Sequence, residues 1–329
     1  MPDIRRFTPD DREDVRAALE VRNTVETADA SWERPTSLDV YTAMLRHGWD
    51  GEPDVPYLMC VEGRPVALGA LSLPERDNRH LAWASVQVLP EHRRRGHGTA
   101  LLAHLVEQAR AAGRTSLGTE GWESEATLAF ADRHGLKRVT QAIQRRQHLA
   151  DIEPGVVQEL YDAAATAARD YELVRVEGRS PADLVDGLVE VTAAINDAPT
   201  DDLDIEDDAM SPERLVAYEE ACLARRNRIY RLVARHRESQ VLAGHTVVVV
   251  EQDRPEVGHQ HDTAVSRDHR GHRLGLLVKA GMLLWLAEAE PGLETIDTWN
   301  AESNEHMIAV NRVLGYRVMG REIGFQKAI

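Results

Sequence analysis

The chain carries one local pattern twice, and this repetition constrains its fold more than any other feature. A basic, glycine-containing loop followed by an apolar segment occurs at RRRGHGTALL (93–102) and again at HRGHRLGLLV (269–278). Thr8-Pro9 and Ser180-Pro181 each precede a helical pattern, at almost the same separation as the two loops. Features that recur in the same order at a near-constant spacing indicate two copies of one fold.

Length and element order both agree with this duplication. A chain of 329 residues is long enough for two ordinary domains. We predict an N-terminal domain over residues 1–150, an alanine-rich linker helix over 151–170 and a C-terminal domain over 171–329. Alternating strand and helix patterns in each half predict the α/β class, with a mixed sheet flanked by helices.

Hydrophobic periodicity places the elements around the two loops. The strand before the loop is expected over residues 81–89 in the first copy and 258–265 in the second. The helix after the first loop is expected over 98–112, because its leucines recur on one stripe. The last strand of each copy is expected over 139–149 and 316–326.

The charge balance excludes several classes of partner. There are 39 Lys and Arg residues against 55 Asp and Glu, a formal net charge of −16, which disfavours nucleic acid and anionic membranes. Cys60 and Cys222 lie far apart and show no metal-ligand spacing. The chain start has no secretion-signal pattern, and no apolar run is long enough to span a bilayer. We therefore expect a cytoplasmic monomer or homodimer with no metal, membrane or nucleic-acid partner.

Each loop has the composition of an anion-binding site. A strand that feeds a glycine-rich turn and then a helix exposes the first N–H groups of that helix, where the helix dipole is positive. Glycine allows the backbone to approach a diphosphate closely, and arginine donates bidentate hydrogen bonds to it. The patterns of a P-loop and of a dinucleotide-binding fold are both absent from the two loops.

Residues 86–98, VQVLPEHRRRGHG, resemble the acetyl-CoA-binding motif of the GNAT acyltransferases. Residues 124–136 and 304–316 resemble the second conserved helix of that family, which ends in glycine followed by an aromatic or aliphatic residue. Over both halves, the chain resembles the tandem GNAT proteins of actinobacteria, mycothiol synthase among them. The resemblance implies two tandem GNAT folds, each with a splayed mixed sheet that admits the pantetheine arm of acetyl-CoA. An amine acceptor then enters from the opposite side.

The same resemblance assigns acetyl-CoA, as cosubstrate, to the two loops. In the first copy the residues expected to bind it are Val88, Arg93, Arg94, Arg95, Gly96, His97 and Gly98. In the second copy they are Val265, Arg270, Gly271, His272, Arg273, Leu274, Gly275, Asn300 and Asn304. Arg273 stands where the family has its first glycine, so it is either strained by a positive φ or supplies a further phosphate contact.

Candidate catalytic residues concentrate in the second copy. Acetyl transfer to an amine needs a base for the ammonium proton, and the strand GHQHDTAV carries His259 and His261. If side chains alternate, both share a face with Val265. Two other interpretations stay open: an inert pair of hydrogen-bonded histidines, or a metal site with Asp262 that lacks a further ligand. The matching strand of the first copy, LAWASVQV, has no acid or base.

An acidic segment offers a cationic acceptor a binding surface. NDAPTDDLDIEDD (196–208) lies between the first two helical patterns of the second copy, a connection that forms a wall of the acceptor site in GNAT folds. Asp201, Asp202 and Asp204 are our candidate substrate-binding residues. The alternative is a solvated acidic loop, since like charges repel one another and stay in water.

The function predicted from these features is an acetyl-CoA-dependent N-acetyltransferase. It transfers an acetyl group to a primary amine of a small, cationic molecule by direct attack in a ternary complex. The second copy catalyses, and the first either binds acetyl-CoA without using it or only completes the architecture. The alternative is a catalytically silent acyl-CoA-binding sensor or scaffold protein. It is favoured by Ala131 and Asn311, which stand where the family often carries a tyrosine as general acid.

Overall fold

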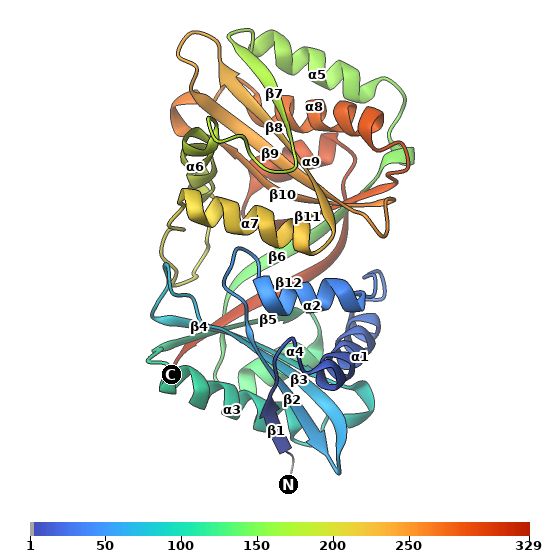
Figure 1. The fold of residues 1–329 in the computed structure, drawn as a ribbon, viewed down its shortest axis with the longest axis vertical. Coiled ribbons are helices and arrows are strands. Elements are labelled where there is room, and N and C mark those ends of the chain that lie inside the picture. The colour runs from blue at the N-terminus through green and yellow to red at the C-terminus, as the bar shows by residue number, and fades with distance from the viewer. Residues whose placement is uncertain (1–2) are drawn as a thin grey trace. The chain divides into compact units, whose positions relative to one another are not determined.

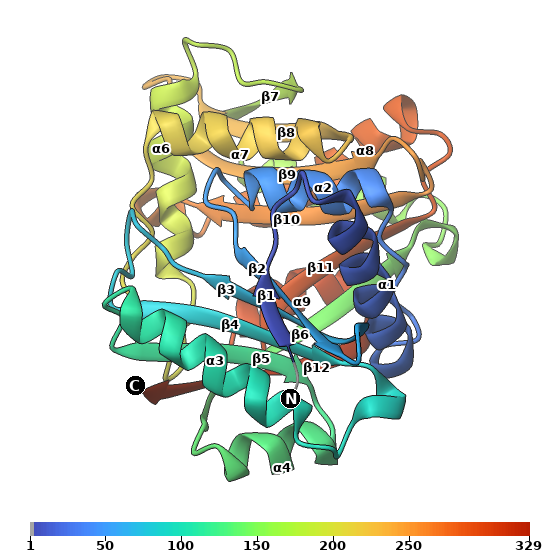
Figure 2. The ribbon, with the colours of Figure 1, turned by 60° about the horizontal axis from the view of Figure 1, so that its bottom comes forward.

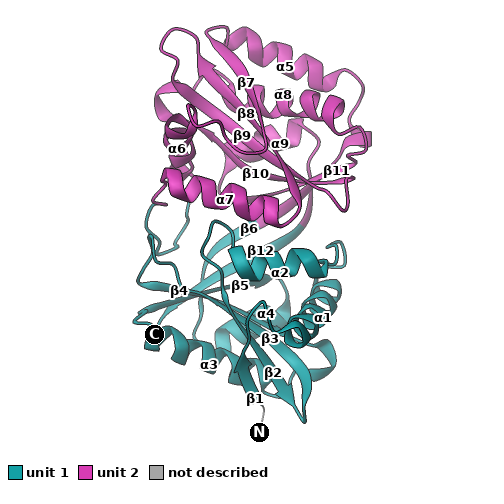
Figure 3. Ribbon diagram, viewed as in Figure 1, with its two compact units in different colours: residues 1–142, 200–207, 320–329 teal, residues 143–199, 208–319 magenta. Residues whose placement is uncertain are grey.

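The computed structural model describes residues 3–329, which form two compact units. Unit 1 contains residues 1–142, 200–207 and 320–329, and unit 2 contains residues 143–199 and 208–319 (Figure 3). Each unit has helices packed on a mixed sheet, as the α/β prediction requires (Figure 1). Strands and helices follow the same order in the two copies, which confirms the predicted duplication.

Unit 1 is built from these elements: β1 (Asp3–Arg6), α1 (Arg12–Asp29), α2 (Leu38–His47), β2 (Val55–Val61), β3 (Arg64–Ser72), β4 (Leu81–Val88), α3 (His97–Ala111), β5 (Ser116–Trp122), α4 (Glu125–Arg133), the start of β6 (Lys137–His148) and the end of β12 (Arg317–Ala328). The strand order is β1-β2-β3-β4-β5-β12, and only β4 and β5 of these neighbours run parallel. Helices α1 and α2 cover one face, and α3 and α4 cover the other (Figure 2).

Unit 2 repeats this plan with the end of β6, α5 (Val156–Ala167), β7 (Tyr171–Glu177), α6 (Val185–Ala193), α7 (Pro212–Ala224), β8 (Asn227–His236), β9 (Leu242–Glu251), β10 (Val257–Val265), α8 (Leu274–Ala289), β11 (Thr295–Ala301), α9 (Glu305–Val313) and the start of β12. The strand order is β6-β11-β10-β9-β8-β7, with β10 and β11 parallel. Helices α6 and α7 cover one face, and α5 and α8 cover the other.

The expected linker helix corresponds to α5, and it belongs to the core of unit 2. Ala164 and Ala168 are buried against Leu277 and Val278 of α8. Gly281 of α8 allows this close approach, because a Cβ there would lie only 3.3 Å from a ring atom of Tyr161. The alanines that suggest a linker therefore serve as a packing surface.

The last strand of each copy is divided between the two units. β12 enters unit 1 at Gly320 and pairs antiparallel with β5. Ile323 and Phe325 of this strand are buried in the unit 1 core beside α3. β6, in turn, belongs to unit 2 from Ile143 onward. The compact units therefore differ from the expected domain limits at residues 150 and 171, because each sheet is completed by the strand that ends the other copy.

Both sheets open where two parallel strands separate. In unit 1 the pairing of β4 with β5 ends at Ala84 and Thr119, although both strands continue. In unit 2 the pairing of β10 with β11 ends at His259 and Asp297, although both strands again continue. This divergence confirms the predicted splayed, mixed sheet in each copy.

The two central strands differ in register. β4 pairs with β3 without a break over its whole paired length. β10 pairs with β9 through a β-bulge between Gln260 and Thr263. A bulge places an extra residue in one strand, so the side chains beyond it change face relative to those before it.

Candidate functional site

The two basic loops share one backbone conformation. Arg94 and Gly96 in unit 1 have φ of 62° and 86°, and Gly271 and Arg273 in unit 2 have φ of 88° and 57°. Each loop therefore has two left-handed residues with one residue between them. Unit 1 has its glycine at the second of these positions and unit 2 at the first. Arg273 does adopt the positive φ that makes a non-glycine residue unfavourable.

Each loop leads directly into a helix whose first turn has no side-chain cap. Gly96 is the N-cap of α3 and Arg273 is the N-cap of α8, and neither helix receives a capping hydrogen bond from a side chain. The first backbone N–H groups can therefore donate to an anion, as a diphosphate requires. A Cβ at Gly96 or Gly271 would meet nothing within 4 Å, so the loops leave open space above the backbone. The residues present thus suit the diphosphate of acetyl-CoA.

The first arginine of each loop is held by its own unit. Arg93 donates from Nε to the Val88 carbonyl at 3.0 Å and from both terminal nitrogens to Asp29 at 2.8 Å. Arg270 donates to the Val265 carbonyl at 3.2 Å and to Asp197 at 2.7 Å. Arg93 thereby ties its loop to the last residue of α1, and Arg270 ties its loop to the turn that follows α6.

Other loop cations remain open to solvent. Arg94, Arg95, His272 and Arg273 are exposed. The ring of His272 lies 5.5 Å from that of Tyr171, between centroids, and the hydroxyl of Tyr171 hydrogen-bonds to His269 at 2.9 Å. Leu274 is buried in the core, so only its backbone N–H is available to a ligand. Gly275 and the half-buried His97 and Gly98 begin the two helices.

His259 lies where the unit 2 sheet opens and is hydrogen-bonded to a carboxylate. Its Nε2 is 2.8 Å from Oε1 of Glu251, and the side chain is 38% exposed. Glu251 also accepts hydrogen bonds from Arg254 at 2.6 and 3.1 Å. Burial acts to raise the pKa of Glu251, but the hydrogen bonds from His259 and Arg254 outweigh it and lower that pKa. The carboxylate is therefore ionised and orients the imidazole.

His261 occupies the bulge of β10 and contacts a tyrosine of α7. The hydroxyl of Tyr218 is 2.5 Å from Nδ1 of His261. Burial lowers the pKa of His261 well below its usual range, with the nearby charges of His259 and Arg225 adding to the effect. Burial likewise raises the pKa of Tyr218. Tyr218 therefore keeps its proton, His261 is neutral, and a hydrogen bond joins the two side chains.

The bulge separates Val265 from the two histidines, which corrects the alternation expected from sequence. Val265 lies beside Gly244 and packs on Leu274 of α8, whereas His261 meets α7 on the opposite face. The extra residue between Gln260 and Thr263 is the physical reason. Among residues 3–329, no three His, Cys, Asp or Glu side chains are grouped as ligands for a metal ion. The metal interpretation of these histidines with Asp262 thus gains no support.

The candidate asparagines of unit 2 are engaged with α9. Asn311, fully buried, donates to Oδ1 of Asn300 at 2.6 Å. Asn304 is the N-cap of α9 and accepts from the N–H of Met307 at 3.1 Å. Asn311 thus occupies the position of the family's tyrosine as an internal hydrogen-bonding residue.

The acidic segment is fixed by contacts within unit 1, although it was expected to line the acceptor site of the second copy. Asp201 accepts from the Thr140 hydroxyl at 2.7 Å, and the Asp202 N–H donates to the Val139 carbonyl at 3.0 Å. The Asp204 N–H donates to Gln326 at 2.8 Å. Residues 200–207 accordingly group with unit 1.

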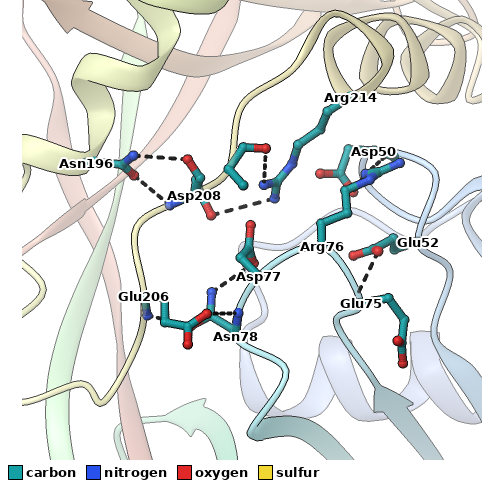
Figure 4. Close-up of polar contacts among 11 residues, drawn as sticks. Asp50, Glu52, Glu75, Arg76, Asp77, Asn78, Asn196, Glu206, Asp208 and Arg214 are labelled. Atoms are coloured by element: carbon teal, nitrogen blue, oxygen red, sulfur yellow. Dashed lines mark hydrogen bonds and ion pairs between the residues drawn. The ribbon is translucent and has the colours of Figure 1, made fainter.

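Paired hydrogen bonds hold this segment on both sides of that division (Figure 4). Within unit 1, Glu206 and Asn78 each accept from the other's backbone N–H at 2.7 Å. Within unit 2, Asn196 brackets the backbone of Asp208 at 3.0 and 3.1 Å, and Asp208 also lies 3.6 Å from Arg214. The segment is thus an ordered connection.

A pair of carboxylates in unit 1, Glu120 and Glu322, was not predicted from the sequence. Burial raises the pKa of Glu322 to about 8, and the charge of Glu120 adds to this effect. Burial and the charge of Asp54 raise the pKa of Glu120 as well, although its side chain is solvent-accessible. Alternation along β5 could have placed Glu120 on the same face as Trp122. Glu322 had no local signal, because the strand exchange brings it from the end of the chain.

Comparison with known proteins shows similarity to one family. Residues 20–136 match the model of the Acetyltransferase (GNAT) family. A curated mycothiol acetyltransferase from Stackebrandtia nassauensis is 28% identical over 323 residues, which cover 97% of this chain and 98% of that protein. A solved tandem GNAT protein from the clavulanic acid biosynthesis pathway has a TM-score of 0.83 and 26% identity, covering 100% of this chain and 98% of its own. The chain is thus similar to tandem GNAT proteins over its whole length.

These similarities support an N-acetyltransferase of the GNAT type, a family that uses acetyl-CoA. A solved GCN5-related N-acetyltransferase from Sphaerobacter thermophilus, 17% identical, shares the fold with a TM-score of 0.69 over 99% of this chain and 95% of its own. Within residues 3–329, no helix combines the length and apolar character needed to cross a membrane.

Proposed function

We propose that unit 2 transfers the acetyl group of acetyl-CoA to a primary amine of a small, cationic molecule, by direct attack in a ternary complex. The observation that carries this proposal is the arrangement on β10. One strand supplies the edge of the open sheet, a bulge and a histidine that is hydrogen-bonded to a carboxylate. β4 of unit 1 offers the open edge without the bulge or the histidine.

His259 is the proposed general base. Its Nε2–H donates to Glu251, so the lone pair of the neutral ring is on Nδ1. When Nδ1 takes a proton from the acceptor ammonium, the carboxylate of Glu251 stabilises the imidazolium. Positioned proton transfer of this kind typically contributes ~10²–10⁴-fold to the rate.

The bulge supplies the proposed stabilisation of negative charge. An extra residue between Gln260 and Thr263 is left out of the regular ladder, so its backbone N–H is not used by β9. Preorganised N–H groups aimed at a developing oxyanion typically contribute ~3–4 kcal/mol to acyl transfer. The bulge lies on the part of β10 that has already separated from β11.

The loop before α8 would hold the diphosphate of acetyl-CoA, which supplies the thioester that is attacked. The first-turn N–H groups of α8 and the side chains of His272 and Arg273 would donate hydrogen bonds to the diphosphate, while Arg270 holds the loop in place. The equivalent loop of unit 1 has the same backbone conformation, and we assign it a second acetyl-CoA site without turnover. The strongly negative net charge favours a cationic acceptor.

The proposal is tested by measuring thiol release from acetyl-CoA with a library of primary amines. We expect amine-dependent release by the unaltered chain and a loss of at least ~100-fold in kcat for His259→Ala. His148→Ala is the control, since that exposed histidine ends β6 and belongs to neither β10 nor β11. Binding of acetyl-CoA with no amine-dependent release would favour the silent sensor or scaffold instead, and full activity of His259→Ala would reject the base.

A further inference from the structure

A carboxylate in the β10 bulge has no role in the function proposed above. Asp262 follows His261 in the bulge, on the part of the strand that has left β11. Asp262 is half-buried. Within residues 3–329, the carboxylate has neither a hydrogen bond nor an ion pair, while other carboxylates of the site, such as Glu251, are fully paired.

The charged groups around Asp262 leave it uncompensated. Burial raises the pKa of Asp262 and the charge of Arg231 of β8 lowers it, but this guanidinium donates to Glu219 at 3.3 Å, and the two side chains are only 2% and 3% exposed. Asp208 is a second carboxylate near Asp262. Tyr218, the α7 residue near Asp262, is hydrogen-bonded to His261. The protein therefore places a carboxylate in the bulge and, among the described residues, bonds no cation to it.

Buried polar atoms of β8 and β9, on the face of the sheet that α7 covers, also lack partners. His245 of β9 is completely buried, pairs in register with Ala264, and neither of its ring nitrogens has a hydrogen-bond partner among the described residues. Nη1 of Arg231 is likewise buried and unpartnered. Buried polar groups are nearly always hydrogen-bonded, so this face has bonding capacity that a ligand or ordered water must use.

We propose that Asp262 binds the ammonium group of the acceptor and so makes unit 2 selective for positively charged amines. This inference rests on the proposed transfer reaction in unit 2. The carboxylate accepts a hydrogen bond from the ammonium, which holds the nitrogen at the bulge. His259 then removes one proton, the nitrogen lone pair forms the new bond to the acetyl carbon, and the bond from that carbon to sulfur breaks. A second proton of the nitrogen passes to the departing sulfur, so the products are the neutral amide and the thiol of CoA. A hydrogen bond from an ammonium to an otherwise unpaired, half-buried carboxylate is of the strong, charge-assisted kind.

The chemistry separates two kinds of acceptor. An alkylamine is an ammonium ion near pH 7, because amines of the lysine type have a pKa of ~10. An aromatic amine is neutral at the same pH and gains nothing from the carboxylate. Hexylamine and aniline are therefore suitable paired probes, and the quantity to measure is the ratio of their kcat/KM values.

We expect Asp262→Asn to lower the hexylamine-to-aniline ratio by at least tenfold, mainly through the KM for hexylamine. Asp262→Glu should recover part of the ratio. His259→Ala should lower kcat for hexylamine and leave its KM unchanged, whereas Asp262→Asn acts mainly through KM, which separates failure of the base from failure of this inference. Asp268→Asn is the matched control, because Asp268 is an exposed carboxylate at the end of the same strand–loop segment and should leave the ratio unchanged.

A binding measurement makes the inference independent of turnover. NMR line broadening of hexylammonium, with hexanol as the neutral probe, is recorded in the Glu120→Gln/Glu322→Gln background to remove the unit 1 carboxylates. We expect the preference for hexylammonium to disappear on Asp262→Asn and to persist on Asp268→Asn. An unchanged preference, or an unchanged kinetic ratio, overturns the assignment of Asp262.

Discussion

The two copies differ at an equivalent position of their parallel strands. In unit 1 the third residue pair between β4 and β5, counted from Leu81–Ser116, is Trp83–Gly118. In unit 2 the third residue pair between β10 and β11, counted from Val257–Thr295, is His259–Asp297. The indole of Trp83 lies over Gly118, where a Cβ would be 2.1 Å from a ring carbon. In unit 2 the same position presents a half-exposed imidazole.

This difference shows that a duplicated backbone can keep its binding loop and change its chemistry at one strand position. Both copies retain the left-handed loop and the uncapped helix that suit a diphosphate. Of the two central strands, β10 has a bulge and β4 does not, and a bulge requires one more residue in the strand. The fold is therefore common to the two copies, whereas the proposed catalytic function depends on local departures from it.

The largest expected difference between the two units is an effect on stability, and it comes from a buried lysine of unit 2. Lys279 of α8 is 3% exposed and lies over the ring of Tyr316 at 5.1 Å from the centroid, where unit 1 has the buried pair Leu102 and Leu136. Burial lowers the pKa of Lys279 from 10.5 to about 7. Between these values the unfolded chain carries the proton and the folded chain does not, so stability rises with pH.

Lys279→Leu should therefore raise the free energy of unfolding by ~2 kcal/mol at pH 6.5, with a smaller gain at pH 10. Thermal and urea denaturation at the two pH values measure this. Leu102→Met is the control in unit 1, expected to change stability by less than ~1.5 kcal/mol at both pH values. A gain that does not depend on pH would show that folding does not lower the pKa of Lys279.

The carboxylate pair of unit 1 gives a smaller effect of opposite sign with pH. The folded pKa of Glu322 is about 8 against 4.5 in the unfolded chain, chiefly because of burial. Its stabilising contribution is complete below pH 4.5 and is lost as pH rises toward 8. Glu322→Gln should leave the melting temperature unchanged at pH 4.5 and raise it by ~2–4 °C at pH 8.5. Glu305→Gln, at the exposed start of α9, should show no such trend.

The smallest expected effect concerns the interchange of glycine in the two loops. Arg273→Gly removes a left-handed arginine whose conformation costs ~1–2 kcal/mol, but the added flexibility of glycine in the unfolded chain offsets ~0.5–1 kcal/mol of that. A net gain below ~1 kcal/mol is expected, together with weaker acetyl-CoA binding by calorimetry. Arg94→Gly should behave alike in unit 1. Unchanged affinity in both variants would exclude these arginines from the diphosphate site.

The sequence could predict the features that depend on residues close together in the chain. Repeated loops, helix stripes and the order of elements follow from patterns within about twenty residues, and the structure confirms them. The sheet face predicted for Val265 was wrong, because a bulge shifts the alternation of side chains and no sequence pattern predicts this bulge. The contacts of Asp201 and Glu322 depend on residues far along the chain, which periodicity cannot reach.

The divided last strands have a consequence for how this protein is made. A ribosome releases the N-terminal half first, yet the sheet of unit 1 lacks the strand that pairs with β5 until residues 320–329 emerge. Ile323 and Phe325, which fill the core beside α3, arrive with that strand. The earliest part of the polypeptide thus waits for the latest part before its hydrophobic interior is closed, a period in which chaperones would have an exposed surface to protect.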